Sequence, residues 1–389
     1  MDINLKYGVN PHQKNAYLNV PNNVLKVLNG KPGYINMLDA LSGWQLVKEL
    51  KNATGKASAA SFKHVSPAGA AVARKLSNTF LKSQFLKDKN YSNIAKAYIR
   101  ARGGDRMSSY GDAACVSEIV DVSLAKYLKK EVSDLIIAPG YENEALDILK
   151  KKKRGKYLIL QIDPSYEPDS EQVRDLYGFK LKQDRDNSKI DKFLFNSTKI
   201  VSENKKIDDK VIEDLIIGNI TLKYTQSNSV CVVYDGQVIG NGAGQQSRVH
   251  CTRLASQKAE KWFLQQHPKV SNLNFEEGLK RASKTNLVDQ FILYNQLSAA
   301  ERKYFLKNLK EKPEILSDDE KDSWFKKFEN ISLVSDAFFP FRDSIDRAEK
   351  LNVKFISQPG GSIRDDKIID IVNEYGMVMF FTGIRLFRH

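Results

Sequence analysis

The sequence predicts an α/β protein, because short apolar runs alternate with helical patterns over most of its length. Residues 57–62 and 135–138 are short and apolar, as buried strands are, and residues 37–50 carry apolar side chains at helical spacing. A second α/β pattern lies further along, where Asp235-Gly236 separates two apolar runs and predicts a hairpin. Three separate regions therefore agree on the fold class.

The first part of the chain is expected to contain its elements in a regular order. The strand over 57–62 ends at Lys63-His64, and Ser66-Pro67 is expected to open a helix over 68–76. The elements expected after these are a Gly/Arg-rich turn at 102–109, the strand at 135–138, a helix at 142–152 and a strand at 157–162.

The second part begins after a polar stretch, 164–204, which reads as an irregular linker or surface excursion. A charged, Lys/Leu-rich stretch with almost no strand signal, 268–330, predicts a helical insertion. The other expected elements are strands at 229–234 and 237–239, a glycine-rich loop at 240–244, a helix at 247–267, a strand from Leu333, a helix from Ser344, and strands at 354–357 and 377–381. We therefore predict a first α/β domain at 1–168, a second at 169–267 plus 331–389, and the insertion at 268–330.

Composition excludes several classes of protein. The 389 residues include 61 Lys+Arg and 47 Asp+Glu, a net charge of +14. No apolar run approaches the roughly 20 residues of a membrane helix, so we expect a cytoplasmic protein without a membrane partner. The three cysteines lack a CxxC pair, and both HExxH and Walker motifs are absent, so we expect neither zinc nor ATP. The longest basic run, Lys150 to Arg154, has only Tyr157 as an aromatic neighbour, so we do not expect a nucleic-acid partner.

Chemistry is expected first at Lys63 and His64, at the end of a predicted buried strand. Burial can bring the pKa of either side chain near 7, as proton transfer requires. His267, before Pro268, is instead expected to cap a helix. Three Gly-rich segments, 102–109, 244–248 and 358–362, suggest sites for phosphates or carboxylates. The aromatic stretch 338–343 reads as core packing or as a grip on a flat heterocycle.

Long motifs then resemble one known family, in order along the chain. They are residues 5–13, 61–70, 105–112, 223–229, 242–248, 335–343 and 383–387. These segments are similar to the AICAR transformylase part of the bifunctional AICAR transformylase/IMP cyclohydrolase family. The resemblance implies two cytidine-deaminase-like α/β/α domains without zinc. It also implies transfer of formyl from 10-formyltetrahydrofolate to the 5-amino group of AICAR ribotide, giving FAICAR in IMP biosynthesis.

The resemblance also implies roles for individual residues. His64 would be the general base, Lys63 the charge stabiliser and proton donor, and His12 a supporting residue. AICAR contacts would be Lys6, Tyr7, Gly111, Asp134, Asn228, Arg248, Phe338 and Arg385. Folate contacts would be Met107, Val249, Pro340, Phe341, Asp343, Ser362 and Ile363. A structural potassium ion would lie near Thr225, Ser227, Ser229 and Asp336. The family forms a homodimer whose active sites take Asn228 and Arg248 from the partner subunit.

Three residues depart from the family pattern. Lys6 replaces a usual Arg and loses its bidentate fork, Tyr110 replaces Phe, and Arg388 replaces His. The cyclohydrolase domain is also absent from this sequence. We expect a stand-alone transformylase that depends on a separate IMP cyclohydrolase, the alternative being an expressed fragment. Two other functions stay open: a basic nucleotide- or RNA-binding protein that has lost catalysis, and a formylating enzyme that uses formate and ATP.

Overall fold

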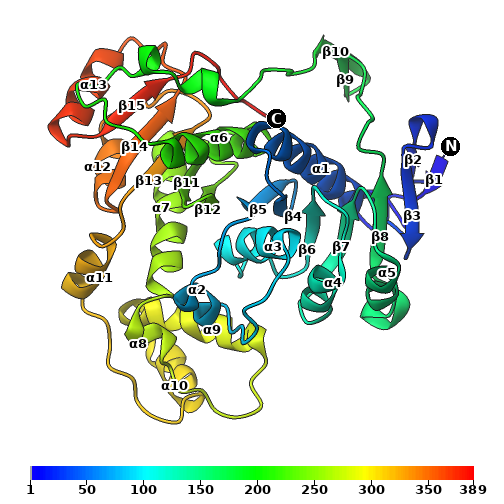
Figure 1. Ribbon diagram of the computed structural model, residues 1–389, viewed down its shortest axis with the longest axis horizontal. Coiled ribbons are helices and arrows are strands. Elements are labelled where there is room, and N and C mark those ends of the chain that lie inside the picture. Colours follow the sequence, from blue (N-terminus) through cyan, green and yellow to red (C-terminus); the bar gives the residue numbers. More distant parts are fainter. Residues whose placement is uncertain (1) are drawn as a thin grey trace.

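The computed structural model describes residues 2–389, apart from the side chain of Asn22. Over these residues, eleven strands form one mixed sheet covered by helices (Figure 1). The strands run across the sheet in the order β15-β14-β13-β11-β12-β5-β4-β6-β7-β8-β3. The predicted α/β fold class is confirmed.

The two halves of this sheet have the same topology. The first half has a hairpin followed by parallel strands: β4 (Ser58–Lys63), β5 (Ser66–Val72), β6 (Asp112–Val116), β7 (Ser133–Ala138) and β8 (Leu158–Ile162), with β3 (Leu25–Asn29) antiparallel at the edge. The second half repeats it with β11 (Val230–Tyr234), β12 (Gln237–Gly242), β13 (Ile331–Ser335), β14 (Val353–Gln358) and β15 (Val378–Phe381). The halves join where β5 and β12 pair antiparallel, at Ala71 and Gln237. The domain boundaries drawn from the sequence stay a prediction.

Helices cover both faces of the sheet. One face packs against α1 (Tyr34–Thr54) and α6 (Asp209–Lys223). The other face packs against α3 (Asn93–Gly104), α4 (Val122–Lys129), α5 (Asn143–Lys150), α7 (Arg248–Leu264), α12 (Asp343–Glu349) and α13 (Asp365–Glu374). Strand β7 shows how one segment serves both cores, because Leu135 and Ile137 face α1 while Ile136 and Ala138 face the opposite layer. The predicted helix over 37–50 and strand over 135–138 are confirmed.

Two predictions in segments of small residues are wrong. Residues 66–72 form the strand β5 and not the start of a helix, and the expected loop at 240–244 is a strand as far as Gly242. Both strands are crossed closely by helices. A Cβ on Gly69 would lie 2.2 Å from the Ala101 carbonyl oxygen of α3, and a Cβ on Gly240 would lie 2.1 Å from the Ala255 carbonyl oxygen of α7. The small side chains therefore serve helix–strand packing.

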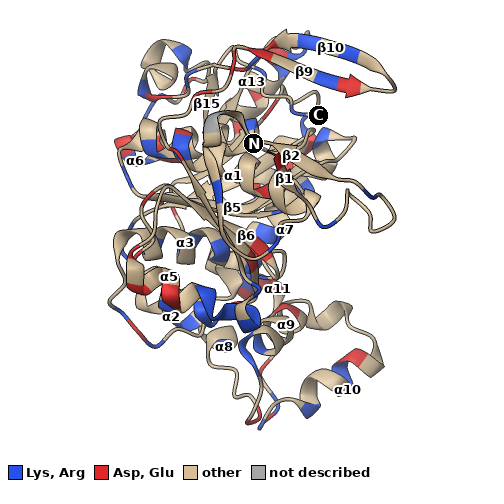
Figure 2. Ribbon diagram, turned by 90° about the vertical axis from the view of Figure 1, so that its right-hand side faces the viewer, with Lys and Arg blue, Asp and Glu red and all other residues tan. Residues whose placement is uncertain are grey.

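Two further expectations fail in polar segments. The turn expected from residue 102 begins later, because α3 continues to Gly104 and buries Arg102. The expected linker contains a hairpin, β9 (Glu171–Leu176) and β10 (Phe179–Asp184), which stands away from the sheet in Figures 1 and 2. Its turn, Tyr177-Gly178, has φ values of 54° and 82°, the left-handed pair that a two-residue hairpin turn needs.

The insertion is helical, as predicted. It contains α8 (Pro268–Ser271), α9 (Arg281–Ile292), α10 (Ala299–Lys307) and α11 (Asp318–Phe325), and α8 and α9 contact α2 (Asn78–Ser83) and α7 respectively. Capping boxes at Ser298 and Ser317 start α10 and α11, and His267 caps α8 by accepting a hydrogen bond from the Lys269 N–H at 3.2 Å. Among the described residues, no helix is both long and apolar enough to cross a membrane.

Candidate active site

The predicted catalytic pair lies at an edge of the sheet where several other predicted residues gather. Strand β4 ends at Lys63 and is antiparallel to β6, so Lys63 lies beside the start of β6. The parallel strands β7 and β8 start at the same edge. Gly111 precedes β6 and Asp134 is the second residue of β7, so both belong to this edge together with Lys63 and His64.

The pairing of the strands shows that the same edge of the sheet continues through its second half. The start of β5 lies at this edge, and β5 is antiparallel to β12, so the edge continues with the end of β12, the start of β11 and the carboxyl ends of β13, β14 and β15. Two contacts join the halves here: the Gln226 N–H donates to Ser66 Oγ at 3.2 Å, and Asn241 Nδ2 donates to the Pro67 carbonyl at 2.9 Å. The predicted residues in segments that enter or leave the sheet here are Met107, Thr225, Ser227, Asn228, Ser229, Arg248, Val249, Asp336, Phe338, Pro340, Phe341, Asp343, Ser362, Ile363 and Arg385.

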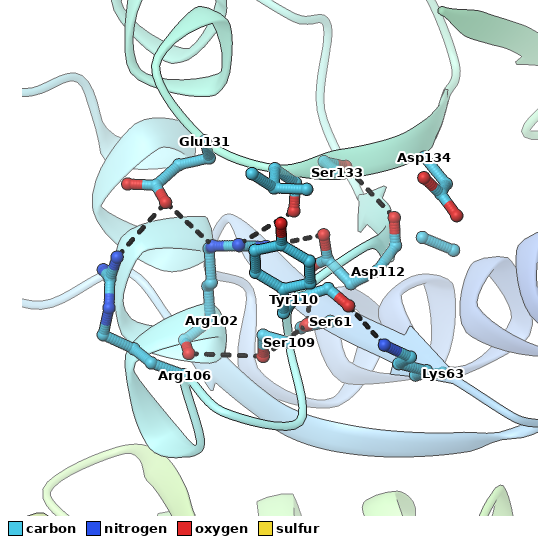
Figure 3. A network of polar contacts seen from close by, with 12 residues as sticks. Ser61, Lys63, Arg102, Arg106, Ser109, Tyr110, Asp112, Glu131, Ser133 and Asp134 are labelled. Carbon is cyan, nitrogen blue, oxygen red and sulfur yellow. Dashed lines mark hydrogen bonds and ion pairs between the residues drawn. The ribbon is translucent and has the colours of Figure 1, made fainter. Parts of the chain in front are cut away.

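His64 lies in the tight turn between β4 and β5. His64 and Val65 have φ values of 53° and 62°, so the turn between β4 and β5 is left-handed at both positions. Asp39 on α1 holds it, because the Val65 N–H donates to Asp39 Oδ1 at 2.6 Å. Burial raises the pKa of Asp39, although the Val65 N–H and the nearby His64 oppose the rise. His64 is exposed, and the Lys63 ammonium donates to the Tyr110 carbonyl (Figure 3).

A buried polar network lies beneath Lys63 and the 105–111 loop. Asp112 is fully buried and accepts hydrogen bonds from Ser61 Oγ at 2.6 Å, Tyr98 Oη at 2.8 Å and Arg102 Nη1 at 2.6 Å. Ser61 Oγ also lies 2.8 Å from Ser109 Oγ, next to Tyr110 (Figure 3). Because Ser61 is two residues before Lys63 on β4, the network fixes the strand that carries the predicted catalytic lysine.

Glu131 completes the network on its far side. Its carboxylate pairs with Arg102 at 3.3 Å, with Arg106 at 3.2 Å, and with Arg281 from the helical insertion. Burial alone would raise the pKa of Glu131, but the three guanidinium groups outweigh it and lower the pKa. The insertion is thereby connected through one ion pair to the core beneath the site.

Gly111 and Asp134 lie in contact. Gly111 has a φ of 79°, and a Cβ there would lie 3.6 Å from Asp134 Oδ2. The half-exposed Asp134 carboxylate pairs with the ammonium of Lys153, which sequence reasoning left unassigned within the basic run. Its neighbour Lys152 is partly buried, and burial together with Lys153 and Arg102 lowers the pKa of Lys152 to about 8. Part of the basic run therefore faces the site edge.

Arg248 and Asp336 form a second buried polar cluster. Arg248 donates to the Ser229 carbonyl at 2.8 Å and to Asn228 Oδ1 at 2.9 Å, and it pairs with Asp336. The fully buried Asp336 carboxylate also accepts hydrogen bonds from Ser227 Oγ at 2.6 Å and Ser229 Oγ at 2.9 Å. Carboxylate and hydroxyl oxygens are the ligands that hard cations take, so this donor set fits an alkali cation. Arg248 already balances the charge of Asp336.

Five predicted folate residues lie after β13 and β14: Pro340, Phe341 and Asp343 between β13 and the start of α12, and Ser362 and Ile363 in the loop after β14. Met107 lies before β6, and Val249 lies at the start of α7. The Arg364 guanidinium lies 4.4 Å from the centroid of the exposed Phe341 ring and links the two loops. The N–H groups of Gly361 and Ser362 donate to Asp365 Oδ2 at 2.7 and 3.1 Å. These N–H groups were expected to be free for an anion, but a carboxylate of the chain itself occupies them.

The N-terminal residues are less closely tied to the pair. The Lys6 N–H donates to the Pro32 carbonyl at 3.0 Å, just before α1 starts at the site edge, and Tyr7 is partly exposed. His12 is exposed, and within residues 2–389 no hydrogen bond joins it to Lys63 or His64. The supporting role of His12 stays a prediction.

Comparison with known proteins decides the family. The family described as AICARFT/IMPCHase bienzyme matches residues 1–258 of the chain. The chain belongs to this family. Proteins named bifunctional purine biosynthesis protein PurH are similar over almost the whole chain: 30% identity over 393 residues in Persephonella marina, 28% over 394 in Clostridium botulinum and 29% over 392 in Aquifex aeolicus. These alignments cover 99%, 100% and 99% of the chain but 59% of each relative, so the chain spans about three fifths of their length.

Two departures from the family pattern have visible surroundings. Tyr110 exposes half of its side chain and contacts Lys63 through its backbone carbonyl, which any residue supplies. Arg388 donates to Ser42 Oγ on α1 at 2.9 Å, and its guanidinium lies 5.3 Å from the Tyr224 ring centroid. Arg388 therefore connects the C-terminal segment to both halves of the sheet.

Sequence reasoning missed the residues that support the family motifs. Asp39, Arg102 and Glu131 touch the Lys63-His64 turn or the network beneath it. Asp39 and Glu131 were not singled out, and Arg102 was expected only as part of the Gly/Arg-rich turn at 102–109. For Asp39 a signal existed, since it shares the buried stripe of its helix with Leu46 and Leu50, where an acid is rare. Arg102 and Glu131 offered no comparable spacing signal.

Proposed function

We propose that the chain is a phosphoribosylaminoimidazolecarboxamide (AICAR) formyltransferase acting in purine biosynthesis, with 10-formyltetrahydrofolate as formyl donor. The observation that supports it best is the shared edge of the sheet. The Lys63-His64 turn, the predicted AICAR residues Gly111 and Asp134, and the loops predicted to bind folate all lie along that edge. Family membership and relatives named for purine biosynthesis support a function in that pathway.

The chemistry divides between two side chains. His64 removes a proton from the 5-amino group as its nitrogen attacks the formyl carbon, and the bond between that carbon and N10 of the folate breaks. Lys63 stabilises the negative charge that develops on the formyl oxygen and gives a proton to N10. An ammonium has three donors, so one hydrogen bond to the Tyr110 carbonyl orients Lys63 and leaves two donors for substrate.

A homodimer would complete the sites. Asn228 and Arg248 lie on the same edge as Lys63, so a two-fold axis that sets two such edges together would give each site residues from both subunits. The β9–β10 hairpin supports a partner, because cross-strand pairing puts Leu176, Phe179 and Leu181 on one face, where all three are more than half exposed. We assign that face to a second copy of this chain, and a potassium ion to the oxygen cluster around Asp336.

A coupled assay tests the function. Purified protein with AICAR ribotide and 10-formyltetrahydrofolate, and with a separate IMP cyclohydrolase to remove FAICAR, should produce IMP without added metal or ATP. The cyclohydrolase is needed because formylation of so weak an amine is poorly favourable alone. Without added cyclohydrolase, the chain should form only a small equilibrium amount of FAICAR and no IMP. The absence of formyl transfer under coupled conditions would refute the proposal.

Point variants separate catalysis from folding. His64→Ala should bind AICAR ribotide as the native protein does and lose turnover, because the exposed His64 imidazole contributes little to packing. Lys63→Met should behave in the same way. The matched control is Lys129→Ala on α4, an exposed lysine that is not among the predicted site residues. If His64→Ala instead unfolds, His64 has a structural role.

A further inference from the structure

A cavity of about 600 Å³ lies between α4, the connection from α2 to α3, and the first residue of α9. Its volume is in the range of small-molecule sites, and none of the residues predicted to bind AICAR or folate lines it. Figure 1 shows α2 next to α9 below α3, at the boundary between the sheet's helical layer and the insertion.

The lining is positively charged. It carries Lys87, Lys126, Lys130 and Arg281 against one carboxylate, Asp88. Arg281 is paired with Glu131, whereas the three lysines have no ion pair among the residues that the structure describes. Unpaired ammonium groups gathered around a hollow attract an anion.

Three aromatic residues form part of the wall, beside Leu86, Asn90, Val122 and Ser123. Phe85, Tyr91 and Tyr127 line the cavity, with the rings of Tyr91 and Tyr127 edge to face at 6.4 Å between centroids. Tyr127 is only 3% exposed, yet its hydroxyl has no hydrogen-bond partner within the described part of the chain. A buried hydroxyl without a partner is rare in native proteins. The charges that act on this hydroxyl belong to Glu131, Arg106 and Arg102, so it faces the buried network, and only the ring of Tyr127 borders the cavity.

We propose that this cavity is a second ligand site, which binds a nucleoside monophosphate. Lys126 and Lys130 bind the phosphate, and the base packs against the rings of Tyr91 and Phe85. A free phosphate would leave the aromatic wall unused, and an uncharged nucleoside would leave the lysines unused. The site is separate from the proposed active site, although Arg281 connects its wall to Glu131.

Calorimetric titration of the full chain with adenosine 5′-monophosphate tests the proposal, with adenosine and inorganic phosphate as separate arms. Lys126→Ala/Lys130→Ala should weaken binding of the nucleotide at least about tenfold. The matched control Lys129→Ala, on the same helix but outside the cavity, should bind as the native protein does. Adenosine and phosphate should each bind more weakly than the nucleotide.

Tyr91→Ala gives a second readout. It should weaken nucleotide binding, because the Tyr91 ring forms part of the aromatic wall, whereas Tyr127→Phe, which removes a hydroxyl that does not face the cavity, should bind as the native protein does. Equal affinity in the double lysine variant, or binding that Arg248→Ala abolishes, would overturn the proposal by assigning the nucleotide to the other site. Formyl transfer is not measured, so failure of the proposed function would leave this result unaffected.

Discussion

The Val65 N–H donates a hydrogen bond to Asp39 Oδ1 at 2.6 Å, and this bond holds the turn that carries His64. The second half of the sheet repeats the arrangement, since the Gly236 N–H donates to Asp214 Oδ1 on α6, also at 2.6 Å. Each half therefore fixes its central hairpin with an acid from the helix that precedes it. Only the first hairpin carries the Lys-His pair, so the proposed chemistry belongs to one half of a duplicated scaffold.

Removal of the first acid should weaken both the turn and turnover. Asp39→Ala takes away the acceptor for the Val65 N–H, so we expect the free energy of unfolding to fall by about 1–3 kcal/mol. We also expect kcat to fall more than KM rises, because His64 loses its position. Asp39→Asn keeps an acceptor oxygen and should recover most of the stability. Urea unfolding measures the free energy of unfolding, and the coupled assay measures kcat and KM. If Asp39→Ala keeps the stability and the rate of the native protein, the hydrogen bond does not have this role.

Tyr110→Phe, which restores the usual family residue, should change little. Lys63 contacts the backbone carbonyl of Tyr110, and the ring is half exposed. We expect a stability change within about 0.5 kcal/mol and an unchanged kcat. A large loss of kcat, measured beside Lys63→Met, would show that the Tyr110 hydroxyl takes part in the reaction.

The buried network should be sensitive to the loss of one charge. Arg102→Met leaves Asp112 and Glu131 without a shared cation in the interior, so we expect a loss of about 3–5 kcal/mol in urea unfolding. Lys182→Ala, which breaks an exposed pair with Glu171, is the control and should cost less than about 1 kcal/mol. Similar losses in the two variants would mean that burial does not govern the network.

Replacement of apolar residues by serine tests whether the hairpin face contacts a second copy of the chain. Phe179→Ser/Leu181→Ser removes two exposed apolar side chains, each worth about 1.5–3 kcal/mol when buried, so the dimer dissociation constant should rise at least about tenfold. Lys180→Ser, on the opposite face, should leave it unchanged. Sedimentation velocity across a dilution series measures the constant. An unchanged constant in the double variant would exclude this face from the interface.

Local chemistry made some elements predictable. The strand expected at 57–62 is β4, and Asp235-Gly236 forms the expected hairpin turn, because strand ends and tight turns depend on neighbouring residues. Segments of small residues were not predictable in this way. Residues 68–72 contain good helix formers, but contact with α1 and α3 makes them a strand.

The supporting parts of the site depend on contacts that sequence spacing does not reveal. The three partners of the Asp112 carboxylate come from two other elements, with Ser61 on β4 and Tyr98 and Arg102 on α3. Only the three-dimensional arrangement of these elements shows that the acid is satisfied. The family motifs identified the residues at the edge, and the structure adds the network that supports them.

The acid of the second hairpin gives a prediction for pH. Burial raises the pKa of Asp214 to about 7, although Arg74 and the Gly236 N–H oppose the rise. In the unfolded chain the carboxyl group titrates near 3.8, so between about pH 4 and 7 the folded protein holds a proton that the unfolded chain has released. The contribution of this group to the free energy of unfolding therefore falls as pH rises through that window and is constant above it.

Asp214→Asn should remove this dependence, because an amide does not ionise and its oxygen can still accept the Gly236 N–H. The free energy of unfolding of the variant, relative to the native protein, should therefore rise by about 2–3 kcal/mol from pH 5 to pH 8. Urea unfolding of both proteins at the two pH values measures the difference. Asp209→Asn, on the exposed first turn of the same helix, is the control and should give no such rise. A difference that stays constant with pH would mean that Asp214 is ionised throughout, with Arg74 outweighing the effect of burial.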